Sequence, residues 1–428
     1  MSEARHRLLS HANSLGAALL LAVATLLFTS VPSARAGEIT VIDGIPHVRN
    51  EKPPGRQVTM TPREMWRRGG DDDDIFFGNI ARIDHDDAGN FYILDRQQCE
   101  VTVLTAEGEF VRTLGRRGEG PGELYRPADF YLRRGGGVGM MQQFPGKVVL
   151  VDGEGVPAGG FTVSSGDGPA TGFMALVDSR SRGDHVVIAG IDMAFEGGVT
   201  KQTYFLSAVD DAGVRQVTYL SKQNTINFAD FVGSEETMDF IWWGQRWALA
   251  PGGHVVANMD RNQYRIQEFD ASGELLRVVE RAYESWERSD DELSEARQVL
   301  RAAVSGYPAP PTSLEIEETD PDISAIYARD DGSFWVRTSR GDRPEGGGVL
   351  TVLDAFDVDG HLTHEIAVRM QGNVGVDALY VCGDRILQVT NALGAFVAGH
   401  GGRADVDETE EEEKEKLEVV CYEVGGSR

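Results

Sequence analysis

Cysteine is scarce in this chain, with only Cys99, Cys382 and Cys421 among 428 residues. A scaffold held by disulfides, which is typical of small domains with too little core, is therefore excluded. The chain has to fold by burying apolar side chains. Cys382 and Cys421 both fall in the last repeat of the chain, so a bridge between them is possible. It would close a loop of about 38 residues and stabilise the fold. Two buried free thiols are the alternative.

Basic residues are also few, 41 Lys and Arg against 68 Asp and Glu, so the formal net charge is −27. Such a surface repels phosphate backbones, whose binding requires Lys and Arg to displace counterions. We therefore expect no nucleic-acid partner. The acidity favours solubility and says little about the fold.

Long apolar runs are missing after residue 36, and the first 36 residues have the three zones of a signal peptide. Arg5 and Arg7 are basic, residues 15–28 are apolar, and Ala34-Arg35-Ala36 predicts cleavage before Gly37. The apolar stretch is short for a bilayer core about 30 Å thick, although an uncleaved anchor is the open alternative. We expect an exported mature chain, periplasmic or secreted, without a membrane span.

Glycine, in contrast, is abundant, and six glycine turns recur along the chain. The turns lie at residues 87–90, 135–137, 182–184, 251–253, 330–332 and 382–384. Each one opens an apolar run of about five residues, which is the usual length of a strand. The pattern predicts six copies of one small antiparallel sheet.

The stretches Gly89–Gly108 and Gly253–Gly273 show the repeating unit best. Each contains a strand, a polar Asp-Arg-x-Gln corner, a second strand with period-two alternation and a closing glycine turn. With one strand before and one after, the unit is a four-stranded meander, which is a propeller blade. Six blades stacked around an axis cover each other's faces. The predicted fold is an all-β, six-bladed β-propeller of four-stranded antiparallel blades over residues 37–428.

The last repeat reaches the end of the chain with only three strands, ending in Leu417–Glu423. At the other end, Ile39–Arg49 has the pattern of a turn and a strand without a preceding blade. We therefore predict that this N-terminal strand completes the last sheet and closes the ring, which removes exposed sheet edges.

Three motifs carry a resemblance to a known group: Asp84–Asp95, Glu107–Val111, and Gly115–Glu123 followed by Pro127. Together they resemble an NHL-type repeat, and the set is similar to bacterial exported six-bladed propellers of the broad TolB-like group. The resemblance is clearest over residues 78–133. It implies the propeller fold and a binding platform, and it carries over no catalytic residue.

Two segments interrupt the repeat. Over residues 289–305, the capping-box pattern Ser289-Asp290-Asp291-Glu292 and apolar residues at helical spacing predict a helical insertion. This insertion is expected to be a decoration of one face of the disc or a lid over it. The acidic run over residues 405–416 predicts a solvated, flexible loop.

Candidate ligand-binding residues come from two places. The innermost strands line the axis, where a pre-formed pocket is expected, and they contribute Arg82, Asp129, Arg246 and Asp377. Near the crossing Gly115–Gly122, a basic neighbourhood that would steer an anionic ligand contains Arg116, Arg117 and Arg126. Both sets also fit ordinary polar residues of the channel wall or of an inter-blade crossing.

Tryptophan is rare, with six residues in the chain. Trp66, Trp242 and Trp243 lie outside the clearest strands. They predict either an exposed aromatic patch for carbohydrate or protein contact or additional core packing.

Motifs for catalysis and for metal binding are missing. There is no Gly-x-Ser-x-Gly nucleophile elbow, and the odd offset of His361 and His364 places them on opposite faces of a strand. The acidic turn Asp84–Asn90 lacks the distal Glu of a calcium loop. We predict no catalytic residue, no cofactor and no metal; weakly held calcium at the acidic runs Asp71–Asp74 and Glu410–Glu413 is the open alternative.

These observations favour an exported, monomeric, non-catalytic propeller that binds a protein, peptide or glycan through one face of the disc. The alternative is a metal-dependent propeller lyase or hydrolase with its site at the central channel, so the absence of enzymatic activity is an expectation only. A structural module of a larger envelope assembly is a third hypothesis.

Overall fold

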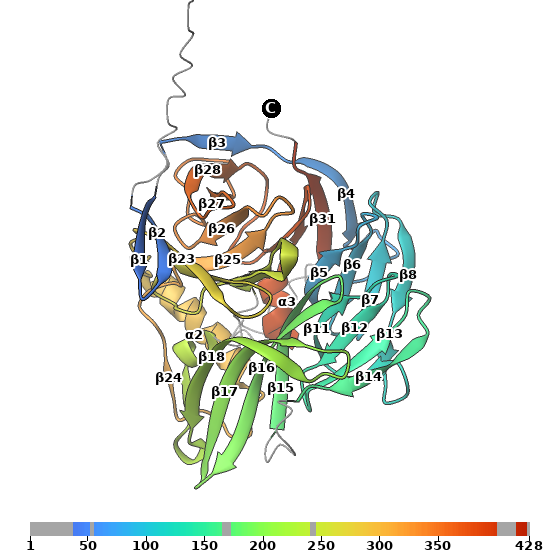
Figure 1. Ribbon diagram of the computed structural model, residues 1–428. Coiled ribbons are helices and arrows are strands. Elements are labelled where there is room, and N and C mark those ends of the chain that lie inside the picture. The colour runs from blue at the N-terminus through green and yellow to red at the C-terminus, as the bar shows by residue number, and fades with distance from the viewer. Residues whose placement is uncertain (1–36, 52–54, 165–172, 240–244, 400–416, 426–428) are drawn as a thin grey trace, which may run out of the picture. The chain divides into compact units, whose positions relative to one another are not determined.

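Six antiparallel sheets follow one another around a common axis in the computed structural model, which describes residues 37–51, 55–164, 173–239, 245–399 and 417–425 (Figure 1). In the first five blades four consecutive strands lie side by side as in a meander, and in the sixth blade three consecutive strands do so. The six-bladed propeller predicted from the sequence is thus confirmed.

The blades are formed by strands of three to twelve residues. The first three blades are β5 (Ile80–His85), β6 (Phe91–Asp95), β7 (Glu100–Leu104), β8 (Phe110–Leu114); β11 (Pro127–Leu132), β12 (Val138–Gln142), β13 (Lys147–Val151), β14 (Pro157–Thr162); and β15 (Phe173–Arg182), β16 (His185–Glu196), β17 (Val199–Val209), β18 (Arg215–Ile226). The last three are β20 (Trp247–Leu249), β21 (Val255–Ala257), β22 (Arg265–Phe269), β23 (Leu275–Arg281); β25 (Ile323–Ala328), β26 (Phe334–Thr338), β27 (Thr351–Phe356), β28 (Leu362–Val368); and β29 (Ala378–Cys382), β30 (Arg385–Val389), β31 (Glu418–Glu423).

The first strand of each blade is the innermost. Strand β5 contacts β11 and β29, strand β15 contacts β11 and β20, and β20 contacts β25, so the inner strands succeed one another around the axis. The turn after each inner strand opens towards one face of the propeller. We call this face the turn face, and the opposite one, where the inner strands begin, the crossing face.

The N-terminal segment runs along the outer edges of three blades in succession. The hairpin of β1 (Glu38–Ile42) and β2 (Ile45–Asn50) extends the fourth blade, because β2 pairs in parallel with β23. Next, β3 (Gln57–Met60) pairs in parallel with β28 of the fifth blade. Finally, β4 (Arg63–Gly69) pairs antiparallel with β31 and completes the sixth blade.

The predicted closure by an N-terminal strand is therefore present, but the prediction that Ile39–Arg49 supplies it was wrong. Arg63–Gly69 occupies that place instead. The physical reason is visible in the burial of β4, where only Trp66 and Gly69 are buried. An outermost strand exposes most of its side chains, so the segment shows no apolar alternation in the sequence.

Trp66 anchors the closing strand. Its indole Nε1 donates a hydrogen bond to the Ala106 carbonyl at 2.9 Å, and its ring meets Phe91 edge to face with centroids 5.6 Å apart. The ring lies over Gly108, whose φ of +81° and lack of a side chain make room for it. Of the two predictions for Trp66, core packing is thus the correct one, while Trp242 and Trp243 lie outside the described residues.

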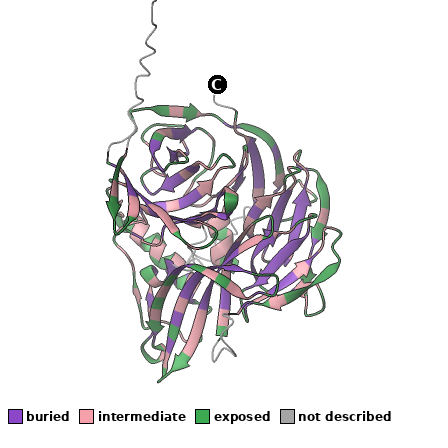
Figure 2. Cartoon of the chain, in the orientation of Figure 1, coloured by how far each residue is buried: buried purple, intermediate pink, exposed green. Residues whose placement is uncertain are grey.

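The core lies between neighbouring blades, where both faces of each sheet are covered (Figure 2). All three cysteines are buried and free, so the predicted alternative of a bridge between Cys382 and Cys421 does not hold. Strand β30 separates their strands. Two inter-strand steps span about 9.5 Å, which is more than the roughly 7 Å between Cα atoms that a disulfide tolerates.

The insertion lies on the crossing face, because it connects β23, the outer strand of one blade, to β25, the inner strand of the next. It contains α2 (Asp290–Val304) and β24 (Ser313–Glu315), which pairs with β19 (Val232–Ser234) from the preceding blade connection. The capping box at the start of α2 is formed by Ser289 and Glu292. The helices α1 (Glu235–Asp239) and α3 (Ala392–Gly399) contact α2. The predicted acidic loop over 405–416 lies outside the described residues.

Within the described residues, no helix combines the length and the apolar character needed to cross a membrane.

Candidate functional site

A cavity of about 600 Å³ lies on the turn face, at the centre of the propeller. The last residue of every inner strand lines it: His85, Leu132, Arg182, Leu249, Ala328 and Cys382. The turns that follow most of these strands complete the wall. We call this cavity the axial pocket, and all six blades contribute to it.

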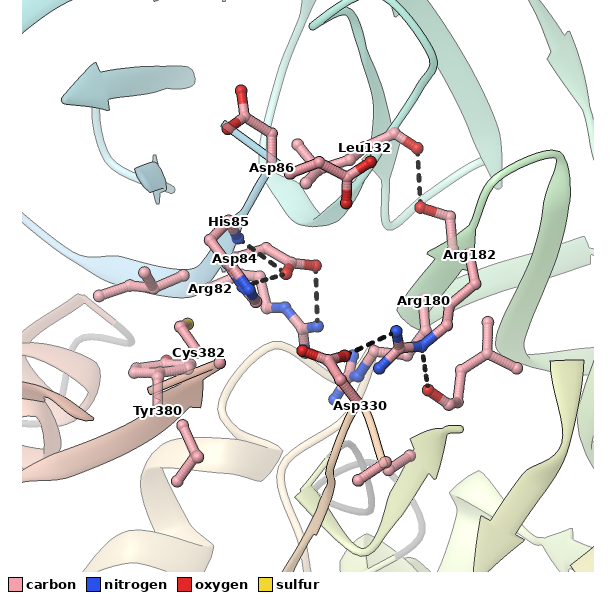
Figure 3. Close-up of a pocket in the computed structure, with 18 of the residues that line it drawn as sticks. Arg82, Asp84, His85, Asp86, Leu132, Arg180, Arg182, Asp330, Tyr380 and Cys382 are labelled. Carbon is pink, nitrogen blue, oxygen red and sulfur yellow. Dashed lines mark hydrogen bonds and ion pairs between the residues drawn. The ribbon is translucent and has the colours of Figure 1, made fainter. Parts of the chain in front are cut away.

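The lining of the axial pocket is rich in charged groups. Its arginines are Arg82, Arg133, Arg134, Arg180, Arg182 and Arg329, and its carboxylates are Asp84, Asp86, Asp87 and Asp330. Figure 3 shows Arg82, Asp84 and His85 grouped on one side of the cavity, with Arg180 and Arg182 on the other. Leu132, Ile326 and Tyr380 supply apolar surface between the charges.

Arg82 and Arg180 form the floor of the pocket. The Arg180 guanidinium pairs with Asp178 and lies 4.8 Å from the centre of the Trp247 ring. Trp247 in turn donates its indole N–H to Asp178 at 2.7 Å. Arg82 is held less closely, with guanidinium nitrogens 3.4 Å from Asp84 and 4.0 Å from Asp178.

Two carboxyl groups, Asp129 and Asp178, lie beneath the floor and interact with each other. Burial and the neighbouring charge of Asp178 raise the pKa of Asp129 well above its ordinary value. Burial alone would also raise the pKa of Asp178, but Arg180 and the hydrogen bond from Asp129 lower it. Arg180 bridges the two groups, because its guanidinium pairs with Asp178 and lies 3.6 Å from Asp129 Oδ2.

His85 lies at the end of β5 between Asp84 and Cys382. The interaction with the Asp84 carboxylate, whose Oδ1 is 3.8 Å from the imidazole Nδ1, raises the pKa of His85, as does the contact with the Cys382 thiol. Burial opposes this effect but does not outweigh it. The imidazole is therefore a cation at neutral pH.

The protonated state of His85 has a measurable consequence for stability. Because its pKa in the folded protein is about 10, above the ordinary value of about 6.5, the charged imidazole stabilises the fold fully below about pH 6.5. This contribution is lost as the pH rises towards 10. We expect the stability difference between the wild type and His85→Gln to shrink over this range, as measured by urea unfolding at several pH values. A difference that stays constant with pH would contradict a raised pKa.

The arginines in the wall of the pocket differ in whether they form ion pairs or hydrogen bonds with other residues. Arg182 pairs with Asp330 at 3.0 Å, and Arg134 pairs with Asp184 at 3.0 Å. Arg329 lies over the Trp335 ring, 4.1 Å from its centre, and donates to the Gly383 carbonyl at 2.6 Å. Arg133 is half-buried, and its guanidinium has no hydrogen bond or ion pair with any residue that the structure describes.

The four residues proposed from the sequence to line the axis lie in different parts of the structure. Arg82 lines the axial pocket, and Asp129 lies just beneath it, where it accepts a hydrogen bond from the Ser179 backbone N–H at 2.7 Å. Arg246 lies at the crossing face and pairs with Asp239 at 2.7 Å. Asp377 accepts from the Asn391 backbone and from the Gln388 amide, which makes it part of a loop anchor.

The proposed basic neighbourhood lies away from the axial pocket. Arg116 and Arg117 form the short strand β9 (Arg116–Arg117), which pairs in parallel with β10 (Glu123–Leu124) in the inter-blade crossing. Arg116 pairs with Glu123 at 2.6 Å, and Arg117 donates to the Gln97 carbonyl at 2.6 Å. Arg126 has a φ of +48° at the end of this crossing. None of the three lines the pocket.

Sequence reasoning missed most of the pocket. It selected residues near the starts of the inner strands, such as Arg246 and Asp377, whereas the pocket is built from their ends. The signal was present, because His85, Arg133 and Arg329 lie directly before the acidic or glycine-rich turns that marked the repeat. Each therefore lies at the end of an inner strand, on the face where the pocket opens.

The acidic turn after β5 is a hairpin turn closed by its own side chains. Asp86 accepts hydrogen bonds from the backbone N–H groups of Ala88 and Asn90 at 3.0 and 2.9 Å. Among the described residues, no three His, Cys, Asp or Glu side chains are grouped so that they would hold a metal ion.

Comparisons with known proteins agree with the fold. A family described as a 6-bladed beta-propeller matches residues 71–150, which cover the first blade and most of the second. No curated protein matches the sequence.

Several solved structures are similar to this chain. They include a putative exported protein from Bacteroides fragilis, with 13% identity, coverage of 86% of this chain and 100% of its own, and a TM-score of 0.41. A protein from Bacteroides vulgatus has 8% identity, coverage of 86% and 98%, and a TM-score of 0.46. Virginiamycin B lyase from Staphylococcus aureus has 8% identity, coverage of 83% and 98%, and a TM-score of 0.39. Similarities this distant carry nothing about ligand or activity.

Proposed function

We propose that this protein is an exported, non-catalytic binding propeller that recognises a peptide, protein or glycan ligand by taking part of it into the axial pocket. The observation that carries the proposal is the pocket itself, a pre-formed cavity of about 600 Å³ to which the ends of all six inner strands contribute. Concave, largely pre-formed sites of this size are where proteins usually bind ligands. Export rests on the signal-peptide pattern of the first 36 residues.

The charged groups of the pocket favour binding over catalysis. Asp129 and Asp178, the two interacting carboxyl groups, are buried under Arg82 and Arg180 and do not line the cavity. A general acid has to reach the proton that it transfers, and this pair is out of reach of a ligand in the pocket. The alternative is a metal-dependent lyase or hydrolase. Among the described residues, no group of His, Cys, Asp or Glu side chains that would hold a metal ion supports it.

Blocking the pocket tests the proposal. Ala88 is exposed on the rim of the axial pocket, so Ala88→Trp narrows the entrance without disturbing the core. We expect this variant to weaken ligand binding by at least about tenfold, which is about 1.4 kcal/mol. Binding is measured by screening the mature protein on glycan and peptide arrays and then titrating the ligands that are found.

The chain offers a matched control. Ala212 lies in a turn of the same sequence, Asp-Asp-Ala-Gly, between β17 and β18 of the third blade. It is also exposed, and its backbone N–H donates to Asp210 at 3.0 Å, as that of Ala88 does to Asp86. It lies outside the pocket, so Ala212→Trp is expected to bind like the wild type. Ligands that bind all three proteins equally would show that the pocket is not the recognition site, and so would the absence of any ligand sensitive to Ala88→Trp.

A further inference from the structure

We propose that the group taken into the axial pocket is an oxyanion of an organic ligand, a carboxylate, sulfate or phosphate, bound on the side formed by β5 and β11. This inference rests on the proposed function, since it names the chemistry of the group that the same pocket holds. Three cationic side chains on that side, Arg82, His85 and Arg133, have hydrogen-bonding capacity that the described residues do not use.

The sign of the charge in the pocket is opposite to that of the molecule. The lining has six arginines and four aspartates. Asp178 and Asp184, just outside it, pair with Arg180 and Arg134, so the excess of positive charge is that of His85. The chain as a whole has a formal charge of −27. An acidic surface repels anions, and a cationic cavity within it concentrates and retains them at one place.

Arg82 and His85 each have a buried nitrogen that makes no hydrogen bond to a residue that the structure describes. Within the described part of the chain, Arg82 Nε and His85 Nδ1 are buried atoms that have no hydrogen-bond partner. The contacts of Arg82 with Asp84 and Asp178, at 3.4 and 4.0 Å, are long for N–H···O bonds. Buried donors are nearly always satisfied in native proteins, by protein groups, by water or by a ligand. His85 Nδ1 lies 3.8 Å from Asp84 Oδ1, which is also beyond hydrogen-bond distance. An oxyanion would bring acceptors closer to these two groups.

Arg133 is the wall arginine that is free to take part. Its neighbours Arg134 and Arg182 already pair with Asp184 and Asp330, whereas its own guanidinium pairs with no residue in the described ranges. The side chain is half-buried at the end of β11, next to the inner strand β5 that holds Arg82 and His85. A planar guanidinium binds carboxylate, sulfate and phosphate oxygens in pairs, which adds geometric selectivity to charge.

The remaining surface of the pocket indicates an organic anion. The cavity of about 600 Å³ is far larger than an inorganic ion, and Leu132, Ile326 and Tyr380 provide apolar walls beside the charges. In such sites apolar side chains usually contact most of the ligand, and a few polar groups fix its orientation.

Small oxyanions are suitable probes. The mature protein is titrated with sulfate and with citrate against chloride at matched ionic strength, and binding is followed by calorimetry and by the rise in melting temperature that ligand binding causes. We expect both oxyanions, and not chloride, to bind the wild type. Arg133→Gln is expected to weaken them about tenfold, as for the loss of a hydrogen bond to a charged group, and Arg133→Lys to recover part of the loss.

Two further variants locate the site. Arg63→Gln removes an exposed arginine on β4 that pairs with Glu423, far from the pocket lining, and it is expected to leave oxyanion binding unchanged. Arg117→Gln tests the basic crossing on the opposite face. Oxyanion binding that Arg117→Gln weakens and Arg133→Gln does not would overturn the inference, and so would a wild type that responds to sulfate and citrate no more than to chloride. In both cases a ligand sensitive to Ala88→Trp would leave the proposed function standing.

Discussion

Replacing Trp66 with alanine is expected to lower the free energy of unfolding by about 3–5 kcal/mol, as for other buried aromatic side chains. The substitution removes the edge-to-face contact with Phe91 and the hydrogen bond to the Ala106 carbonyl. It also leaves a cavity over Gly108, where the backbone at φ +81° has no side chain to fill the space. Urea unfolding of the purified mature protein measures the effect.

Met65 is the matched control, because it precedes Trp66 in the same strand and is 38% exposed. Met65→Ala is expected to change stability by no more than about 0.5 kcal/mol, which is usual for surface positions. If the two variants were equally stable, β4 would not be the strand that holds the ring closed. The comparison therefore tests the closure itself and not only the burial of one side chain.

Replacing Glu235 with glutamine is expected to destabilise the fold by a similar amount, about 3–5 kcal/mol, because it breaks a buried ionic cluster at one member. The Glu235 carboxylate accepts two hydrogen bonds from Arg288, both at 2.8 Å, and one from Arg261 at 3.2 Å. All three side chains are more than nine-tenths buried. The neutral amide would leave two buried arginines short of counter-charge.

This cluster ties the crossing-face insertion to the blades. Glu235 belongs to α1, Arg288 precedes α2, and Arg261 lies in the fourth blade. The exposed pair of Glu196 and Lys201 provides the control, since Glu196→Gln is expected to cost less than about 1 kcal/mol. Unfolding midpoints in urea compare the two variants. Equal effects would mean that the buried cluster contributes no more than a surface ion pair.

The cluster also explains why sequence reasoning was uncertain about the insertion. The capping box of Ser289 and Glu292 and the apolar spacing of the helix were local signals, and they depend only on neighbouring residues. Whether the helix is a lid over a site depends on the face that it covers. The structure places it on the crossing face, opposite the axial pocket, because Arg288 and Arg343 anchor it there through Glu235 and Glu292.

The candidate site was predictable in part. The expectation that ligand-binding residues come from the inner strands led to Arg82, which lines the pocket. It could not show which end of each strand faces the cavity, so Arg246 and Asp377 were chosen as well. Burial then decided the role of Asp129, since a carboxyl group hidden beneath two arginines holds the floor in place and does not meet a ligand.

The sequence by itself determined the blade and the number of blades. A meander requires strands that alternate with period two and turns with positive φ, where glycine is favoured, as at Gly89 and Gly108. These requirements are local, and each repeat of the sequence shows them. Tertiary structure alone decided which N-terminal segment closes the ring and which side chains form the pocket. Both depend on contacts between residues far apart in the chain, Trp66 with Phe91 and Ala106, and His85 with Cys382. An outer strand is mostly exposed, and the pocket is lined by the ends of six strands that lie far apart in the sequence, so neither leaves a periodic pattern in the sequence.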